Sequence, residues 1–142
     1  MTTPSGQRPT APPSLSILIV DDEPALRNMV ARALEFGGHR SLQANDGDEA
    51  LILLTAVKPA IQLVLTDLRM PGLDGAGLGR AVHERFPDVG IMYMSAYGHD
   101  DVDLPHSDAM PLFLGKPFTT DELLEAVNQA AHRLERRDMQ RR

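Results

Sequence analysis

The chain has 142 residues, a length that suits one globular domain with a substantial hydrophobic core. Apolar residues make up 42% of the chain and charged residues 24%, as in folded rather than disordered proteins. The net charge of -6 disfavours non-specific binding to nucleic acid or to an anionic membrane surface. Cysteine is absent, which excludes disulfides and thiolate metal sites. We therefore expect a single cytoplasmic domain.

The first 14 residues differ in composition from the rest of the chain. They contain Pro, Ser, Thr and Gly and almost no large apolar side chains. They also lack the charged start and apolar stretch of a signal peptide, and no later apolar run approaches the roughly 18 residues of a membrane-spanning helix. We predict a disordered leader over residues 1–14, a folded domain over residues 15–136 and a basic tail over residues 137–142.

Short apolar runs alternate with helical patterns along the predicted domain. The first run, residues 17–20, is followed by a helical pattern over residues 24–36, and Pro24 suits the first turn of a helix. Further strands are predicted at residues 39–44, 63–66, 89–94 and 112–115. Further helices are predicted at residues 46–57 and 75–86 and, after a capping box of Thr119 and Glu122, through Leu134.

Residues 98–111 interrupt this regular alternation. The segment contains four Asp residues and two prolines, Pro105 and Pro111. This composition predicts a short or irregular fourth helix. Strands that are short apolar runs and alternate with helices indicate a parallel sheet covered on both faces. The fold class is therefore α/β, a doubly wound sheet of five parallel strands with helices on both faces.

Polar side chains follow the carboxyl ends of four of the five predicted strands. Asp21 and Asp22 follow the first strand, and Asp67, Ser95 and Lys116 follow the third, fourth and fifth. In a doubly wound sheet these ends share one edge, where ligands bind. Three neighbouring carboxylates repel one another unless a cation joins them, and oxygen ligands without sulfur favour a hard ion. We predict Mg²⁺, or Mn²⁺, at this edge.

The same constellation predicts phosphoryl chemistry. An aspartate carboxylate can attack phosphorus to form an aspartyl phosphate, while Mg²⁺ takes phosphate oxygens in its open positions. Lys116 can supply a compact positive charge, and Ser95 a hydroxyl donor. Each residue alone suits a helix cap or a solvated surface, but their joint placement indicates that Asp67 accepts a phosphoryl group.

The surrounding residues resemble a known family. The run Asp67–Gly75 (DLRMPGLDG), with Asp21–Glu23 (DDE) before it and Leu114–Phe118 (LGKPF) after it, resembles the response-regulator receiver domains of two-component signalling over residues 16–134. The resemblance implies a flavodoxin-like strand order of 2-1-3-4-5, and residues 98–111 look most like receivers attached to hybrid sensor kinases. A sensor histidine kinase or a histidine phosphotransfer protein would supply the phosphoryl group.

The resemblance also implies a set of metal and phosphoryl ligands. Asp67 would be the phosphoacceptor, Asp22 a direct magnesium ligand, and Asp21 a ligand mostly through water. Arg69 would supply a further metal ligand through its backbone carbonyl, and Lys116 would contact the phosphoryl group.

Other residues would act after phosphoryl transfer. Ser95 would hydrogen-bond a phosphoryl oxygen, and Phe113 would be the rotating aromatic residue, without the hydroxyl of the commoner tyrosine. Arg69 and Tyr97 would shield the phosphoryl group from water and so tune its lifetime. The Lys116–Pro117 peptide bond would be cis.

Three alternative interpretations stay open. A phosphatase of the haloacid dehalogenase type also uses an aspartate nucleophile, but it requires a second Asp where Arg69 stands. A flavodoxin-like cofactor binder could share the sheet, but the acidic Asp21–Glu23 loop would repel a flavin phosphate. The third alternative is a receiver-like interaction module that is never phosphorylated. Because the chain ends soon after the last predicted helix, we expect signalling by protein–protein contact with an unknown downstream target, and no nucleic-acid or membrane partner.

Overall fold

The computed structural model describes residues 14–57, 60–96 and 112–140. Residues 1–13 of the predicted leader lie outside this part of the chain. The predicted short or irregular helix in residues 98–111 also lies outside it, as does Tyr97.

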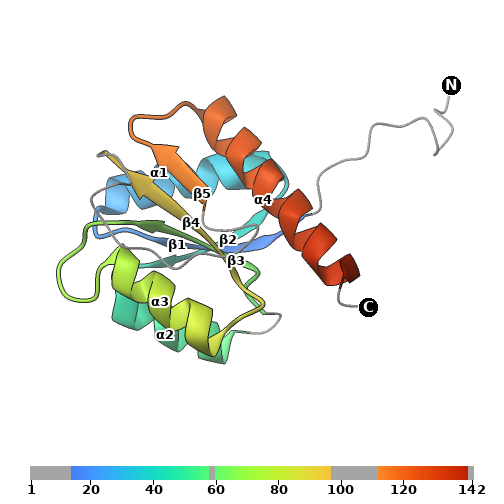
Figure 1. Ribbon diagram of the computed structural model, residues 1–142. Coiled ribbons are helices and arrows are strands. Elements are labelled where there is room, and N and C mark those ends of the chain that lie inside the picture. Colours follow the sequence, from blue (N-terminus) through green and yellow to red (C-terminus); the bar gives the residue numbers. More distant parts are fainter. Residues whose placement is uncertain (1–13, 58–59, 97–111, 141–142) are drawn as a thin grey trace, which may run out of the picture.

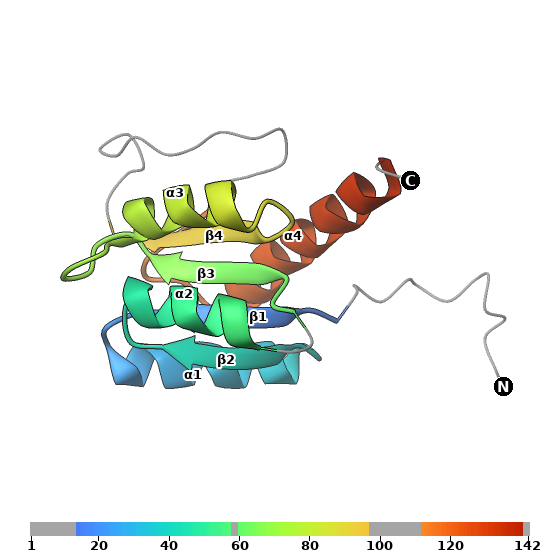
Figure 2. The same ribbon diagram turned by 90° about the horizontal axis from the view of Figure 1, so that it is seen from below.

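The described residues form one sheet of five parallel strands between two layers of helices (Figures 1 and 2). The strand order is β2-β1-β3-β4-β5, so the predicted doubly wound topology is confirmed. The strands are β1 Ser16–Val20, β2 Arg40–Ala44, β3 Leu63–Asp67, β4 Gly90–Ser95 and β5 Leu112–Gly115. Their bounds lie within a residue or two of the predicted ones, because the central strands are nearly continuous apolar runs.

In the described part of the chain, two helices cover each face of the sheet. Helices α1 (Pro24–Phe36) and α4 (Thr120–Gln140) pack on one face, and α2 (Gly47–Ala56) and α3 (Gly75–Arg85) pack on the other (Figures 1 and 2). The central strands β1, β3 and β4 therefore bury both sets of their alternating side chains, whereas the edge strand β2 is largely exposed. In β1, Ile17 and Ile19 contribute to the core beneath α1 and α4, whereas Leu18 and Val20 contribute to the core beneath α2 and α3.

Polar side chains cap three of the four described helices. The predicted capping box is present, because the Glu122 amide donates to Thr119 Oγ1 at 3.0 Å and the Thr119 amide donates to Glu122 Oε1 at 2.8 Å. Asp46 and Asp74 cap α2 and α3 by accepting hydrogen bonds from backbone amides one turn into each helix. Polar side chains thus cap α2, α3 and α4, whereas α1 has no side-chain cap hydrogen bond and begins with Pro24.

Helix α4 is longer than predicted. It continues through Gln140 and so includes residues 137–140, which the composition assigned to a basic tail. Arg137 explains part of this extension, since its Nη2 donates to the carbonyl of Asp88 at 2.6 Å and joins the helix to the connection between α3 and β4. Glu, Arg, Met and Gln are also good helix formers, and this intrinsic preference continues the helix beyond its last buried residue, Leu134.

Candidate functional site

The polar residues predicted at the strand ends meet at the carboxyl edge of the sheet. Asp21 and Asp22 directly follow β1, Asp67 is the last residue of β3, and Ser95 is the last residue of β4. Parallel pairing aligns these ends, because Asp67 lies opposite Met94 and therefore one position before Ser95. Topology alone thus brings together side chains that are far apart in the sequence.

Three carboxylates form the centre of this site. Asp21, Asp22 and Asp67 each offer an oxygen, and these oxygens lie within 4.8 Å of one another. Their exposure differs: the side chain of Asp21 is 1% exposed and that of Asp67 is 15% exposed, whereas Asp22 lies at the surface. The site is therefore an acidic cluster of Asp21, Asp22 and Asp67, with one buried, one exposed and one partly buried carboxylate.

Lys116 lies beside two of the three carboxylates. Its Nζ is 3.4 Å from Asp21 Oδ2 and 3.5 Å from Asp67 Oδ1. The backbone places it there, because the Lys116 amide donates to the carbonyl of Ser95 at 2.9 Å and the Lys116–Pro117 peptide bond is cis, as expected from the resemblance. One ammonium group therefore neutralises only part of the charge of three carboxylates.

The environment of Asp67 disfavours its charged form. Burial raises the pKa of its carboxyl above the usual value, and the nearby Asp21 carboxylate raises this pKa further. The charge of Lys116 and a hydrogen bond from the Arg69 amide act in the opposite direction, but the net shift of the pKa is upward. A cation beside Asp67 would favour the ionised carboxylate that a nucleophile requires.

The donor set fits a hard divalent cation. It offers carboxylate oxygens without sulfur or imidazole, which are the ligands that Mg²⁺ and Mn²⁺ prefer. With all groups ionised, three carboxylates and one ammonium leave two uncompensated negative charges, which a divalent ion balances. Asp22 is exposed, so water or phosphate oxygens can reach this side of the cluster as further ligands.

The loop between β3 and α3 approaches the acceptor closely. A Cβ atom at Gly75 would overlap the carbonyl oxygen of Asp67 and lie 2.7 Å from Cα of Leu68, both backbone atoms that cannot move aside easily. The Gly75 amide donates to the carbonyl of Leu68 at 2.9 Å and closes the loop. Only glycine fits this approach, so Gly75 helps to set the position of Asp67. Arg69 lies exposed in the same loop.

Ser95 and Phe113 lie on neighbouring strands beside the acceptor. Ser95 is buried at the end of β4, and Phe113 is half-buried on β5. The ring of Phe113 stacks on that of Tyr93, with centroids 5.4 Å apart and planes at 30°. Tyr93 itself is fully buried in the core beneath α2 and α3. Any rotation of Phe113 therefore changes a contact with an immobilised aromatic ring.

Two polar groups important for the edges of the sheet were not predicted. Arg27 in the first turn of α1 donates to the carbonyl of Asp21, and no periodic pattern distinguishes it from a solvated helix residue. His39, predicted as the first residue of a strand, instead precedes β2, and its buried Nδ1 accepts the amide of Leu15 at 3.1 Å. Each side chain bonds to a backbone group of another segment, and the sequence does not show which segments lie side by side.

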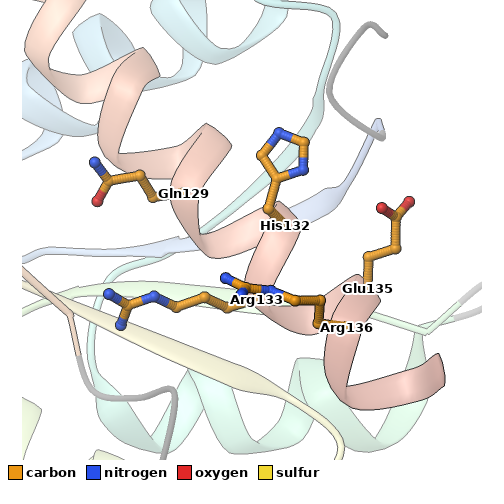
Figure 3. A pocket seen from close by; sticks show the side chains of 5 residues that line it. All are labelled: Gln129, His132, Arg133, Glu135 and Arg136. Carbon is orange, nitrogen blue, oxygen red and sulfur yellow. The ribbon is translucent and has the colours of Figure 1, made fainter. Parts of the chain in front are cut away.

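A hollow on the outer surface of α4 offers a different chemistry. Its lining residues all come from successive turns of this helix (Figure 3): Gln129, His132, Arg133, Glu135 and Arg136. The hollow carries both signs of charge and contains one carboxylate, so it does not resemble the acidic cluster at the carboxyl edge. Among the described residues, no helix is both long enough and apolar enough to cross a membrane.

Comparisons with known proteins match most of the chain. The family model for the response regulator receiver domain matches residues 17–128. The chain is 37% identical over 121 residues to the positive alginate biosynthesis regulatory protein of Pseudomonas aeruginosa, covering 82% of this chain and 47% of that protein. It is 32% identical over 114 residues to sporulation initiation phosphotransferase F of Bacillus subtilis, covering 80% of this chain and 90% of that protein.

Solved structures agree with these matches. The response regulator protein TrrA of Thermotoga maritima, crystallised in complex with Mg²⁺-BeF, is 33% identical with a TM-score of 0.71, and the match covers 81% of this chain and 97% of that one. The chain spans about half or less of the first curated relatives, down to 12% of the sensor kinase CckA of Brucella abortus. The family model and the nearly full-length match to the sporulation phosphotransferase nevertheless cover most of this chain. The chain therefore belongs to the family of response regulator receiver domains.

Proposed function

We propose that this receiver domain accepts a phosphoryl group on Asp67 from a histidine kinase or a histidine phosphotransfer protein. The observation that carries the proposal is the acidic cluster, in which Asp21 and Asp22 lie beside Asp67 and Lys116 contacts the acceptor. Its family supports the same role, because receiver domains of two-component systems act as phosphoacceptors. The relatives include a phosphotransferase and a sensor kinase by name.

Asp21, Asp22 and Asp67 would hold the divalent cation, together with the backbone carbonyl of Arg69. When bound, Mg²⁺ supplies positive charge that stabilises the transferring phosphoryl oxygens. The solved relative in complex with Mg²⁺-BeF supports this assignment of the cofactor. Removal of Mg²⁺ with EDTA should therefore abolish phosphorylation.

The chemical step is an in-line displacement at phosphorus. One carboxylate oxygen of Asp67 forms a bond to phosphorus while the bond from phosphorus to the donor histidine nitrogen breaks, and that nitrogen keeps the electron pair. Lys116, whose Nζ is 3.5 Å from Asp67 Oδ1, is placed to contact the phosphoryl group once it is attached. The chain's own groups thus orient the nucleophile and bind the product.

The added charge is the signal. Phosphorylation places about two negative charges on a side chain that carried one, and the new oxygens attract donors from neighbouring strands. Ser95 at the end of β4 would donate its hydroxyl, and Phe113 would rotate as Ser95 moves. Phe113 lies on β5 and stacks on Tyr93 of β4. Its rotation would therefore change the surface of β5 that a downstream protein partner contacts. We place this signalling in the cytoplasm.

A phosphodonor experiment tests the proposal directly. The protein is incubated with Mg²⁺ and acetyl phosphate, and its intact mass is measured at once. We expect the wild type to gain the mass of one phosphoryl group and Asp67→Asn to gain none. Asp46→Asn is the matched control, because Asp46 caps a helix outside the acidic cluster and asparagine is also a good cap.

This control should be phosphorylated like the wild type. An unmodified wild type would disprove the proposal, as would an Asp67→Asn variant that still gains a phosphoryl group. Omission of Mg²⁺ tests the cofactor separately, since we expect no adduct without it.

The lifetime of the phosphoryl group provides a further test. Arg69 lies exposed two residues after Asp67, and Tyr97 follows β4 outside the described residues. If their bulk shields the phosphoryl group from water, Arg69→Ala combined with Tyr97→Ala should shorten the half-life several-fold, measured by decay of the adduct mass. An unchanged half-life would exclude this role for both residues.

A further inference from the structure

Arg27 joins the end of β1 to the end of β2. Its Nη1 donates to the backbone carbonyl of Asp21 at 2.5 Å and to Asn45 Oδ1 at 3.2 Å. Its Nε donates to Gln43 Oε1 at 3.1 Å. The planar guanidinium suits this arrangement, because its donors point in fixed directions toward several acceptors. One half-buried side chain therefore connects the first turn of α1 with two strand ends.

The acceptor on β1 belongs to the peptide between the first two acidic residues. The carbonyl of Asp21 and the amide of Asp22 form one rigid planar unit. Holding this carbonyl restricts the backbone rotation on the Asp21 side and on the Asp22 side. The preceding peptide is held as well, since the Asp21 amide donates to the carbonyl of Ala44 at 3.3 Å. The backbone that carries both carboxylates is therefore fixed from the β2 side.

Asp22 depends on this backbone support more than its neighbours do. The carboxylate of Asp21 accepts the amide of Glu23 at 2.8 Å and contacts Lys116, and the carboxylate of Asp67 also contacts Lys116. In the described parts of the chain, the Asp22 carboxylate has neither a hydrogen bond nor an ion pair. Its oxygen nevertheless lies within 4.8 Å of the other two carboxylates.

We infer that Arg27 is a positioning residue for the cation site, holding the Asp21–Asp22 peptide so that Asp22 faces the other two carboxylates. The inference rests on the proposed function, since it assigns a residue that acts through the proposed metal ligands. Geometry and charge make opposite predictions here. Loss of a positive charge near the site should strengthen cation binding, whereas loss of the support for Asp22 should weaken it.

Two substitutions separate these effects. Mg²⁺ affinity is measured by ¹H–¹⁵N NMR titration with MgCl₂ at constant ionic strength, which also shows whether each variant is folded. Arg27→Met keeps the apolar stem and loses both the charge and the donors, and we expect its Kd for Mg²⁺ to rise about tenfold. Arg27→Lys keeps the charge but cannot bind three acceptors in a planar fork, and we expect a smaller rise.

A purely electrostatic role for Arg27 predicts a different pattern. Arg27→Met would then bind Mg²⁺ more tightly and Arg27→Lys as tightly as the wild type, and either result would overturn the inference. Asn28→Ala is the matched control on the same helix, because it removes the hydrogen bond from Gln43 Nε2 to Asn28 but leaves Arg27 on Asp21. Its affinity should equal that of the wild type.

The failure of this inference can be distinguished from failure of the proposed function. Asp22→Asn serves as the reference variant that lacks a metal ligand. If Mg²⁺ binds the wild type, fails to bind Asp22→Asn and binds Arg27→Met unchanged, only the role of Arg27 is disproved. If the wild type shows no saturable binding, the cation site itself is disproved and the inference falls with it.

Discussion

At the carboxyl edge of the sheet the buried ionisable groups are acids, and at the amino edge the buried ionisable group is His39. Burial raises the pKa of Asp67 and lowers the pKa of His39, so both edges favour the neutral form of the group. At the amino edge the neutral imidazole accepts the amide of Leu15 through its Nδ1 and adds no charge. At the carboxyl edge Asp21 and Asp22 add further negative charge, and Lys116 compensates for only part of it.

The two edges differ in the charge that they bury. Burying a polar group is costly only while its charge or hydrogen-bonding capacity remains unsatisfied. His39 buries a neutral ring whose Nδ1 accepts a backbone amide, and its Nε2 has no hydrogen-bond partner among the described residues. The charge of the carboxylates is balanced only when a cation or protons bind from solution. The charge at that edge therefore depends on pH and on cation concentration.

The largest effect is expected where the backbone itself shapes the carboxyl edge. In Gly75→Ala, the new methyl group meets the backbone of Asp67 and Leu68, so we expect a loss of about 3 kcal/mol in the free energy of unfolding. Urea unfolding monitored by circular dichroism measures it. Gly115→Ala is the control, because a Cβ there has no neighbour within 4 Å among the described residues. Equal stabilities for both variants would show that the edge tolerates expansion.

The amino edge should lose stability on acidification. Burial lowers the pKa of His39, although Asn128 acts in the opposite direction, so the stability contributed by the neutral imidazole is complete above the unfolded value of 6.5 and lost as pH falls through the folded pKa. Between about pH 7.5 and pH 5, wild type should therefore lose stability relative to His39→Gln, whose amide oxygen can still accept. The same change of the urea unfolding midpoint with pH in both proteins would contradict this prediction.

The carboxyl edge should respond to pH in the opposite direction. Because the folded pKa of Asp67 is raised, its carboxyl contributes most to stability below the unfolded value of 3.8, and this contribution is lost as pH rises through the folded pKa. Without Mg²⁺ at pH 7, Asp67→Asn should therefore be more stable than wild type, by on the order of 1 kcal/mol. Unfolding experiments should show this advantage shrinking on acidification.

Addition of Mg²⁺ sharpens the same comparison. The proposed binding of Mg²⁺ to the folded wild type would stabilise it by mass action, so the advantage of Asp67→Asn should also shrink with rising Mg²⁺ concentration. The stability of His39→Gln relative to wild type should not depend on Mg²⁺, since His39 lies at the other edge. A Mg²⁺ effect of equal size on both comparisons would mean that the two edges are not independent.

The fold could be predicted from the sequence because its strongest signals are local. The strands β1, β3 and β4 are nearly continuous apolar runs, and capping residues such as Thr119 mark helix starts. The end of α4 could not be predicted in the same way, because its apolar pattern stops at Leu134 while the helix continues. Helix propensity and the contact of Arg137 with Asp88, which depends on tertiary structure, extend it.

The candidate site was predictable for a different reason. Parallel strands bring their carboxyl ends together whatever their separation in the sequence, so Asp21, Asp67 and Lys116 could be grouped once the strands were assigned. The unequal exposure of the adjacent Asp21 and Asp22 could not be predicted, since it depends on which way each side chain leaves the strand end. The hydrogen bonds of Arg27 depend on that same local geometry.

The length of α4 gives the molecule a mechanical property. Its 21 residues span about 30 Å, and the helix starts four residues after Lys116. A rigid rod of this length amplifies small angular changes: a rotation of one degree about its first turn displaces Gln140 by about 0.5 Å. A sub-ångström rearrangement around Lys116 could thus be converted into a displacement at the opposite end that a binding partner can detect.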